Sequence, residues 1–431
     1  MDGTTSGPVT GEKMSDADAL VSSPGLAVLM REELIARVAP VEELAEEFAP
    51  GLSTDSIAEM CDGVVREFSI NGVAVTHAGG NAVIPGLIDA HTHLLWAGDR
   101  SSEVRMRQQG ASYAEIAAAG GGIAHTVGRT RDSSQQSLLS SGVSRMREAL
   151  ANGTTSMEAK SGYGLDTPTE LALLETMGVL ASDRSLPSLD ITWMGAHDAP
   201  PGQGEKSSRL ADYVEELLSE QLPAVSEQGL ARSCDVFCEP GWFTTEQTSD
   251  VIMAAAEAGL SGRLHIDEFA DGDGARLAAE LDVETADHAL VSSEKGRAAL
   301  GESKCNQGFL LGAPHTMGMQ RFPPIQQAID REWAWTLATD FNPNCRILSL
   351  PMIASLAVQR CAIDPLAALC AVTCNAAETV REHAGRQHGR ITEGAVASLN
   401  ILNGPKWEGW CLQPGSSPFS STLLRGSTVI H

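Results

Sequence analysis

The chain has 431 residues, of which 42% are apolar, and this length is sufficient for a TIM barrel with a smaller second domain. Its formal net charge of −26 argues against nucleic acid or an anionic membrane as a partner, because both require a basic surface. The sequence contains no run of about 18 apolar residues, so no segment is predicted to span a membrane.

The beginning of the chain and its cysteines predict a cytoplasmic protein. Residues 1–20 are polar and lack the basic and apolar regions of a signal peptide, so we expect a disordered N-terminal tail. The nine cysteines are scattered, and no pair has the CxxC spacing of redox or zinc-ribbon motifs. We interpret them as reduced, mostly buried thiols.

A small β-rich domain is predicted from both ends of the chain. Residues 21–82 contain short apolar runs separated by turns such as Asn71-Gly72, and an acidic helix is expected over residues 41–48. Residues 389–431 have the same character. The two parts are expected to form one β-sandwich-like domain.

Residues 83–388 alternate short apolar runs with longer amphipathic segments, which is typical of βα units and a parallel sheet. The eight predicted strands cover residues 83–91, 154–160, 190–196, 233–239, 263–266, 285–290, 308–313 and 335–340. Helices are predicted over residues 134–150, 168–182, 207–222, 244–259, 274–281, 294–300, 322–331, 346–362 and 365–380. Eight such units predict an α/β fold, the TIM (β/α)8 barrel.

Histidines gather at the ends of the predicted strands, where TIM barrels carry their chemistry. His91 and His93 end the first strand at positions i and i+2, so both side chains point the same way. Any one histidine alone would more often be structural. Together with His265 and Asp340, however, they suit one zinc or ferrous iron ion, and the sequence does not choose between these metals.

Glu268 follows His265 by three residues, so it is expected near the metal without binding it. A carboxylate there can take a proton from water and pass it to a leaving nitrogen. Asp267 is a competing candidate, although a continued strand would point it elsewhere. His288 ends the next strand, where it could stabilise a developing negative charge or hold the nucleophile.

Arg100 lies in the loop after the first barrel strand and is a candidate for binding a substrate carboxylate, because the guanidinium fork matches that anion. A surface ion pair is the alternative. Tyr113 and Tyr163 lie in loops rich in Gly and Ser on the same face. The run Gly120–Gly122 lacks the Lys-Ser/Thr of a phosphate-binding loop and is interpreted as a flexible loop.

Several short stretches resemble the imidazolonepropionases, a family of the amidohydrolase superfamily. The stretches are Ala90–His93 with Ala97–Arg100, Gly110–Tyr113 with Ile116–Ile123, Lys160–Leu165, Gly195–His197, Asp235–Glu239, Ala286–His288 and Ala338–Pro343. The most specific are KSGYGL at 160–165 and ATDFNP at 338–343. The resemblance covers about residues 83–380. It implies a homodimeric enzyme that hydrolyses 4-imidazolone-5-propanoate to N-formimidoyl-L-glutamate in histidine degradation.

The resemblance also implies a role for individual residues. The metal ligands would be His91, His93, His265 and Asp340, and the catalytic residues Glu268, His288 and Asp340. The substrate would be bound by Arg100, Tyr113, Tyr163, His197, Asn342, Asn344 and Cys345.

Asn344 and Cys345 depart from the family, which usually has Gly and then Ser or Thr at these positions, so substrate affinity or choice could differ. His315 lies in a loop that also differs from the sequence expected in the family. It would either add a contact in the site or have no role there. Two other functions were weighed. A related hydrolase or deaminase acting on a nucleobase would not need a carboxylate-binding Arg100, and a non-catalytic scaffold would be expected to have lost metal ligands.

Overall fold

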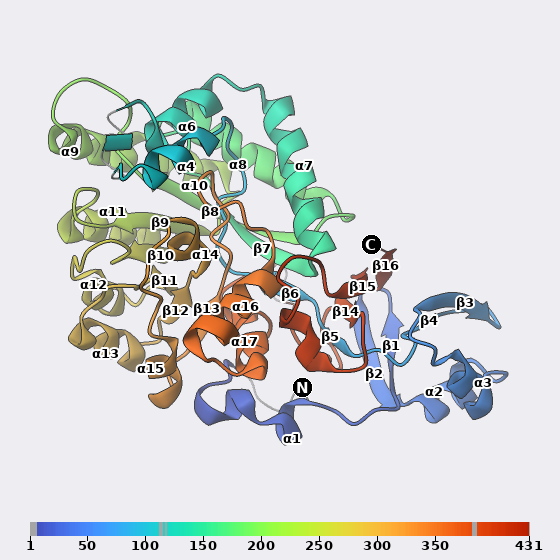
Figure 1. Ribbon diagram of the computed structural model, residues 1–431. Coiled ribbons are helices and arrows are strands. Elements are labelled where there is room, and N and C mark those ends of the chain that lie inside the picture. The colour runs from blue at the N-terminus through green and yellow to red at the C-terminus, as the bar shows by residue number, and fades with distance from the viewer. Residues whose placement is uncertain (1–6, 112–114, 117–118, 382–385, 431) are drawn as a thin grey trace.

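The computed structural model describes residues 7–111, 115–116, 119–381 and 386–430. Eight parallel strands form one sheet in chain order and curve into the barrel of Figure 1. These strands are β6 (Leu87–Asp89), β7 (Thr154–Lys160), β8 (Ser188–Ala196), β9 (Ser233–Cys238), β10 (Ser261–Ile266), β11 (Thr285–His288), β12 (Asn306–Phe309) and β13 (Trp335–Leu337). The prediction of a TIM barrel is confirmed.

Hydrogen bonds just beyond β6 and β13 join the first and last strands of the barrel. The N–H of His93 donates to the carbonyl of Phe341 at 2.8 Å. The buried carboxylate of Asp89 accepts the N–H and the hydroxyl of Thr339, at 2.9 and 2.6 Å. The carboxyl ends of β6 and β13 therefore lie side by side, which brings residues from both ends of the barrel sequence to one place.

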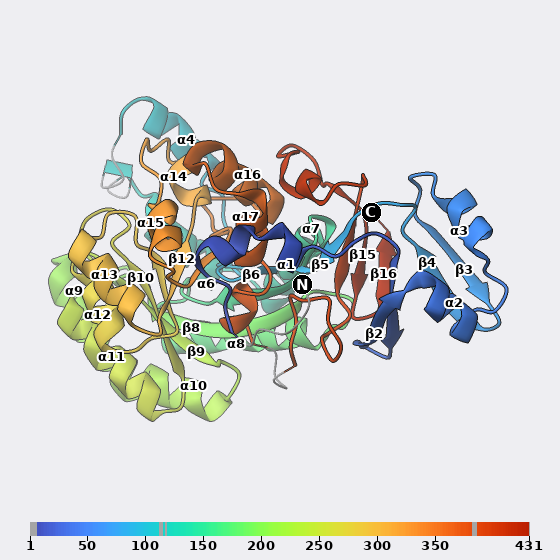
Figure 2. The same cartoon turned by 90° about the horizontal axis from the view of Figure 1, so that it is seen from below.

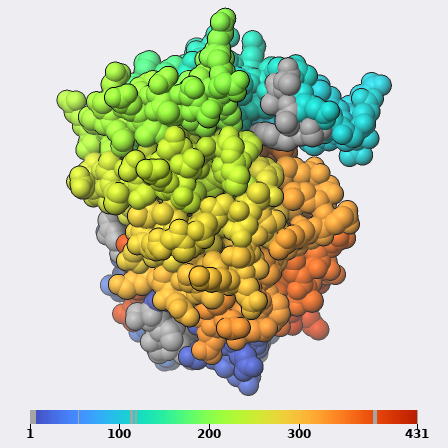
Figure 3. All heavy atoms as spheres, turned by 90° about the vertical axis from the view of Figure 1, so that its left-hand side faces the viewer, coloured from blue at the N-terminus to red at the C-terminus, as the bar shows by residue number. Residues whose placement is uncertain are grey.

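Helices surround the barrel, and Figure 3 shows the outer surface of successive units as adjacent bands from green to orange. The helices of this layer are α7 (Gln135–Ala151), α8 (Thr167–Ser182), α9 (Lys206–Glu216), α10 (Leu222–Gln228), α11 (Thr245–Glu257), α12 (Gly274–Glu280), α13 (Glu294–Glu302), α15 (Ile325–Asp330), α16 (Leu350–Cys361) and α17 (Pro365–Ala371). Capping side chains start several of them; Thr244 and Gln247 form a capping box at α11. Among the residues described, no helix is long and apolar enough to cross a membrane.

A smaller module beside the barrel is built from both chain ends (Figure 2). Its antiparallel sheet has the order β16 (Ser427–Ile430), β15 (Phe419–Leu424), β14 (Leu399–Leu402), β5 (Val83–Pro85). The N-terminal part adds the hairpins β1 (Leu26–Arg31) with β2 (Leu34–Pro40) and β3 (Arg66–Ile70) with β4 (Val73–His77), and the helices α2 (Val41–Phe48) and α3 (Thr54–Met60). Ile35 of β2 packs against Leu399 and Leu423 of the sheet. The domain boundaries themselves stay a prediction.

Two strand predictions need correction. The run predicted as one strand over residues 83–91 is divided at Gly86 into β5, which belongs to the small sheet, and β6 of the barrel. A Cβ atom at Gly86 would lie 2.2 Å from the Thr155 hydroxyl, so the close approach requires glycine. The strand predicted over 308–313 ends at Phe309, and Gly312–Thr316 form the short helix α14.

The glycine run at 120–122 also differs from the prediction of a flexible loop. Helix α6 (Gly122–Arg131) begins there. The N–H of Gly122 donates to the buried carboxylate of Glu103 at 2.9 Å, so this end of the run is held by a side chain from helix α4 (Ser101–Gln108).

The N-terminal segment packs against the barrel, so the prediction of a disordered tail over residues 1–20 is wrong for residues 7–20. Residues Gly11–Ser15 form a 3-10 turn and Ala17–Leu20 form helix α1. Met14 is completely buried in a cluster that contains Trp335. The Asn375 side chain accepts the N–H of Val9 at 2.8 Å and donates to its carbonyl at 2.9 Å. The segment docks because apolar residues in it complete the core.

Met14→Ala is expected to lower the free energy of unfolding by about 2–5 kcal/mol, because it leaves a cavity at a fully buried position. Urea unfolding followed by tryptophan fluorescence measures this change. Lys13→Ala, at the exposed neighbouring position, is the matched control and should change the stability by less than about 0.5 kcal/mol. Equal stability of the two variants would contradict the docking of this segment.

Candidate metal centre and active-site cavity

The four predicted metal ligands converge at the carboxyl end of the barrel. His91 and His93 follow β6, His265 lies in β10, and Asp340 follows β13; all four are buried. The Nε2 atoms of His93 and His265 are 3.2 Å apart. Oδ1 of Asp340 lies 3.7 Å from Nε2 of His91 and 3.7 Å from Nε2 of His93. The structure therefore brings together three nitrogen atoms and one carboxylate from three separate strands.

The chemistry of these donors fits a cation. Nδ1 of His91 lies 2.6 Å from the Asp287 carboxylate, and Nδ1 of His265 lies 2.9 Å from the Asp235 carboxylate. An ionised carboxylate only accepts hydrogen bonds, so each Nδ1 carries the proton and each Nε2 presents a lone pair to the centre. Nε2 of His91 is buried without a hydrogen-bond partner among the described residues. Such convergent lone pairs are what a divalent metal ion would bind.

Burial favours the neutral histidines that metal binding needs. Burial is the largest cause that lowers the pKa of His91 and of His93 well below the ordinary value. Burial likewise raises the pKa of Asp340 to about 7, because an ionised carboxylate is costly to bury without a positive charge beside it. Two overlapping groups could hold an ion, His91 with His93 and Asp340, and His91 with His265 and His288.

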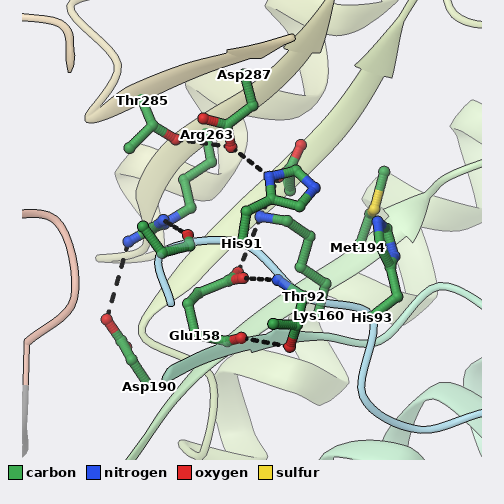
Figure 4. Close-up of polar contacts among 12 residues, drawn as sticks. His91, Thr92, His93, Glu158, Lys160, Asp190, Met194, Arg263, Thr285 and Asp287 are labelled. Carbon is green, nitrogen blue, oxygen red and sulfur yellow. Dashed lines mark hydrogen bonds and ion pairs between the residues drawn. The ribbon is translucent and has the colours of Figure 1, made fainter. Parts of the chain in front are cut away.

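A buried network of charges lies beneath these ligands (Figure 4). Nζ of Lys160 lies 2.9 Å from the Glu158 carboxylate and 2.7 Å from the Asp235 carboxylate, and all three side chains are fully buried. Glu158 accepts the N–H of Thr92 at 3.2 Å, and Thr92 lies between two predicted ligands. Asp235 holds His265. Lys160 thus links the segment after β6, which carries His91 and His93, to His265 on β10.

The sequence analysis assigned no role to Lys160, Asp235 or Asp287. A signal was present for the first, since Glu158 and Lys160 are spaced i and i+2 at the end of a strand, like the two histidines after β6. Although burial lowers the pKa of Lys160, the charges of Asp235 and Glu158 raise it above the ordinary value, so the amine stays charged. The carboxylate partners of the histidines depend on strand neighbours and could not be read from spacing.

The structure separates the two acidic candidates after β10. The Asp267 carboxylate accepts the N–H groups of Gly272 and Gly274, at 3.0 and 3.2 Å, and the hydroxyl of Ser292 at 2.6 Å. Asp267 therefore holds its own loop. Glu268 is buried and lines the cavity above the ligands.

Glu268 is held in place from β9. The Glu239 carboxylate at the end of that strand accepts the N–H groups of Glu268, Phe269 and Ala270, at 2.9, 3.0 and 2.7 Å. Burial, and then the charges of Asp340 and Glu239, raise the pKa of Glu268 well above its ordinary value. Glu239 is a positioning residue that the sequence analysis did not assign.

The cavity is open to solvent, and three of the predicted metal ligands, His93, His265 and Asp340, lie in its wall. The predicted site residues that line it are His93, Arg100, Tyr163, His197, His265, Glu268, His288, Asp340, Asn342, Asn344 and Cys345. Tyr113 lies outside the described residues. His315 is exposed and does not line the cavity.

Several cavity residues are held by specific contacts. Nε and Nη2 of Arg100 donate to the two oxygens of the Glu103 carboxylate, at 2.9 and 2.8 Å. Nδ1 of His197 donates to the carbonyl of Gly162 at 2.8 Å, and the ring of Tyr163 lies 5.1 Å from the ring of His197. The guanidinium and the two rings are therefore fixed in orientation.

The loop at 342–345, which contains Asn344 and Cys345, is closed by its own hydrogen bonds. Oδ1 of Asn342 accepts the N–H groups of Asn344 and Cys345, at 2.8 and 3.0 Å. The Cys345 thiol is buried near the carbonyl of Thr339, at 3.7 Å. The Asn344 side chain accepts a hydrogen bond from Arg107 at 2.7 Å. The Asn344 side chain therefore contacts a charged neighbour, Arg107.

The barrel with the small sheet beside it is a fold that solved structures of deaminases and hydrolases share. Its fold matches 5-methylcytosine deaminase from Klebsiella pneumoniae (TM-score 0.67, 13% identity, 96% of this chain and 95% of that chain). It also matches a zinc-bound adenosine deaminase from Xanthomonas campestris (TM-score 0.62, 15% identity, 96% and 90%). An imidazolonepropionase from Solibacter usitatus is 36% identical over 424 residues, 98% of this chain and 94% of that protein. The chain belongs to the imidazolonepropionase family. No family model matches the sequence.

Lys160→Met is expected to lower the free energy of unfolding by about 3–5 kcal/mol, because two buried carboxylates lose their counter-charge. Urea unfolding of the metal-free protein measures the change. The matched control is Lys206→Met, which breaks the more exposed ion pair with Asp198 and should cost no more than about 1 kcal/mol. A Lys160 variant as stable as the Lys206 variant would rule out the proposed importance of the buried pairs.

Proposed function

We propose that this cavity hydrolyses the cyclic amide of 4-imidazolone-5-propanoate and releases N-formimidoyl-L-glutamate, a step of histidine degradation. The observation that carries the proposal is that the convergent histidines, Glu268 and the guanidinium of Arg100 line one cavity. Family membership supports it, since a relative that aligns over 98% of the chain is named imidazolonepropionase. The enzyme is a hydrolase that acts on a C–N bond.

The predicted ligands His91, His93, His265 and Asp340 would hold one divalent ion, Zn²⁺ or Fe²⁺. The chemistry that such an ion supplies is Lewis acidity, which lowers the pKa of water and makes a carbonyl carbon more electrophilic. Asp235 and Asp287 keep the two histidines that they contact in the tautomer with Nε2 unprotonated.

Glu268 moves the proton in the proposed reaction. Its carboxylate accepts a proton from water as the water oxygen attacks the ring carbonyl carbon, and the same proton then reaches the ring nitrogen as the C–N bond breaks. The raised pKa of Glu268 suits a group that must both accept and return a proton near neutral pH. Nε2 of His288 lies 3.8 Å from the Glu268 carboxylate and keeps it beside the reacting atoms.

Arg100 binds the propionate group of the substrate. Its guanidinium is already oriented by Glu103, so little side-chain entropy is lost on binding. Tyr163, His197 and Asn342 line the rest of the cavity and orient the ring. A buried cation in the cavity favours a substrate with a carboxylate over a nucleobase, the alternative considered from the sequence.

Assembly and location are proposed from the family alone: a homodimer in the cytoplasm. Sedimentation of the purified protein would test the dimer, and a monomer at micromolar concentration would contradict it. The choice between zinc and iron is left to metal analysis of the protein isolated from its source.

The function is tested by following the loss of ultraviolet absorbance as 4-imidazolone-5-propanoate is hydrolysed. Protein loaded with zinc or iron should turn over, and protein stripped by a chelator should not, because the predicted ligands then hold no Lewis acid. His265→Ala should bind less than one ion per chain in elemental analysis. Absence of turnover by protein that holds one ion would reject this substrate.

Glu268→Gln is expected to lower kcat by about 10²–10⁴-fold, because the amide cannot accept the proton of water. Metal content should stay at the wild-type level, since Glu268 is not a predicted ligand. Asp271→Asn, at an exposed position in the same loop, is the matched control and should keep wild-type kcat. Wild-type kcat in the Glu268 variant would remove this residue from the mechanism.

A further inference from the structure

A second hollow, open to solvent, adjoins the catalytic cavity. It is lined by Arg107, Gly110, Ala111, Phe269, Met317 and Asn344, and the last three of these also line the catalytic cavity. The two hollows therefore share a wall. Neither Arg107 nor Phe269 is among the site residues predicted from the sequence, yet both offer chemistry that a ligand could use.

Arg107 carries the positive charge of this outer hollow. Its Nη1 donates to the Asn344 side chain at 2.7 Å and lies 3.9 Å from the Glu103 oxygen that Arg100 also binds. Two guanidinium groups thus approach the same oxygen of one carboxylate beside the two hollows. In a chain with a formal net charge of −26, this local charge offers an anion a favourable path to the cavity.

Asn344 explains why Arg107 is held at this point. Arg107 lies on α4, and its side chain is 17% exposed, so without a partner it could turn toward solvent. The Asn344 side chain fixes it against the loop at 342–345. The guanidinium is therefore held against Asn344, which lines both hollows.

Phe269 supplies an apolar surface beside this charge. Its side chain is 38% exposed, unusual for a large apolar residue, and it lines both hollows. Its N–H is held by Glu239, so the ring is positioned by the same contact that positions the catalytic loop. A cation next to an exposed aromatic ring matches a small molecule with one carboxylate and one planar ring.

We infer that Arg107 and Phe269 form an outer binding subsite for a planar-ring carboxylate, which the substrate occupies before its carboxylate passes to Arg100. This inference rests on the proposed function for the identity of the substrate. Arg107 and Phe269 take no part in the chemical step. Their loss should therefore affect capture of the substrate and leave turnover of bound substrate unchanged.

Steady-state kinetics of the metal-loaded enzyme test whether Arg107 and Phe269 act in substrate capture but not in turnover. Arg107→Gln and Phe269→Ala should each lower kcat/KM for 4-imidazolone-5-propanoate, the former about 10-fold, the typical effect of losing one hydrogen bond to a charged group. Their kcat should equal that of the wild type. The dependence of kcat/KM on salt concentration should weaken in Arg107→Gln only.

The matched control for charge is Arg105→Gln, which changes an exposed arginine two residues away on the same helix. It should keep wild-type kcat/KM. A fall of equal size in both arginine variants would attribute the effect to net charge, and an unchanged Arg107 variant would remove this residue; either result overturns the subsite.

A binding measurement keeps the test independent of the proposed reaction. Calorimetry with 3-phenylpropanoate and with its uncharged amide compares a planar-ring carboxylate with a matched neutral molecule. Arg107→Gln should weaken binding of the carboxylate about 10-fold and leave binding of the amide unchanged. If the wild type fails to hydrolyse the imidazolone but shows this binding pattern, the proposed function fails while the subsite stands; equal binding of the carboxylate by both proteins rejects the subsite.

Discussion

The structure depends on keeping charged groups buried together beneath the carboxyl ends of the barrel strands. Lys160 makes this possible, because its one charge lies between Glu158 on its own strand and Asp235 on β9. A charge in a protein interior is tolerated only when it is paired and hydrogen-bonded. The same two carboxylates hold Thr92 and His265, so the positions of the candidate metal ligands follow from the way these charges are paired.

The backbone conformation at the ends of the strands also helps to place side chains in the cavity. His288 and Asp340 both have positive φ angles, 71° and 51°, which residues other than glycine rarely adopt. Such conformations persist where the surroundings impose them. Here they turn each side chain into the cavity directly after its strand. Asp267, with a φ of 48°, is instead turned into its own loop, and this leaves Glu268 in the cavity.

Charge is distributed unevenly between the site and the rest of the molecule. The chain as a whole is strongly acidic, yet Arg100 lines the catalytic cavity, Arg107 lines the hollow beside it, and both approach the Glu103 carboxylate. A surface of one sign with a small region of the other sign directs an oppositely charged ligand to that region. An anionic substrate therefore fits both the acidic composition and the local geometry.

The sequence by itself determined the barrel, the candidate ligand pair His91 and His93, and the origin of the small sheet in both chain ends, because strand period and the spacing of apolar runs are local properties. Only the tertiary structure decided which carboxylates face the histidines, since Asp235 and Asp287 meet them across neighbouring strands. It also decided between Asp267 and Glu268 through one backbone turn, and it docked Met14 in a core that includes Trp335 and Cys370, both more than 300 positions away. Such contacts depend on packing between distant segments, which no local pattern records.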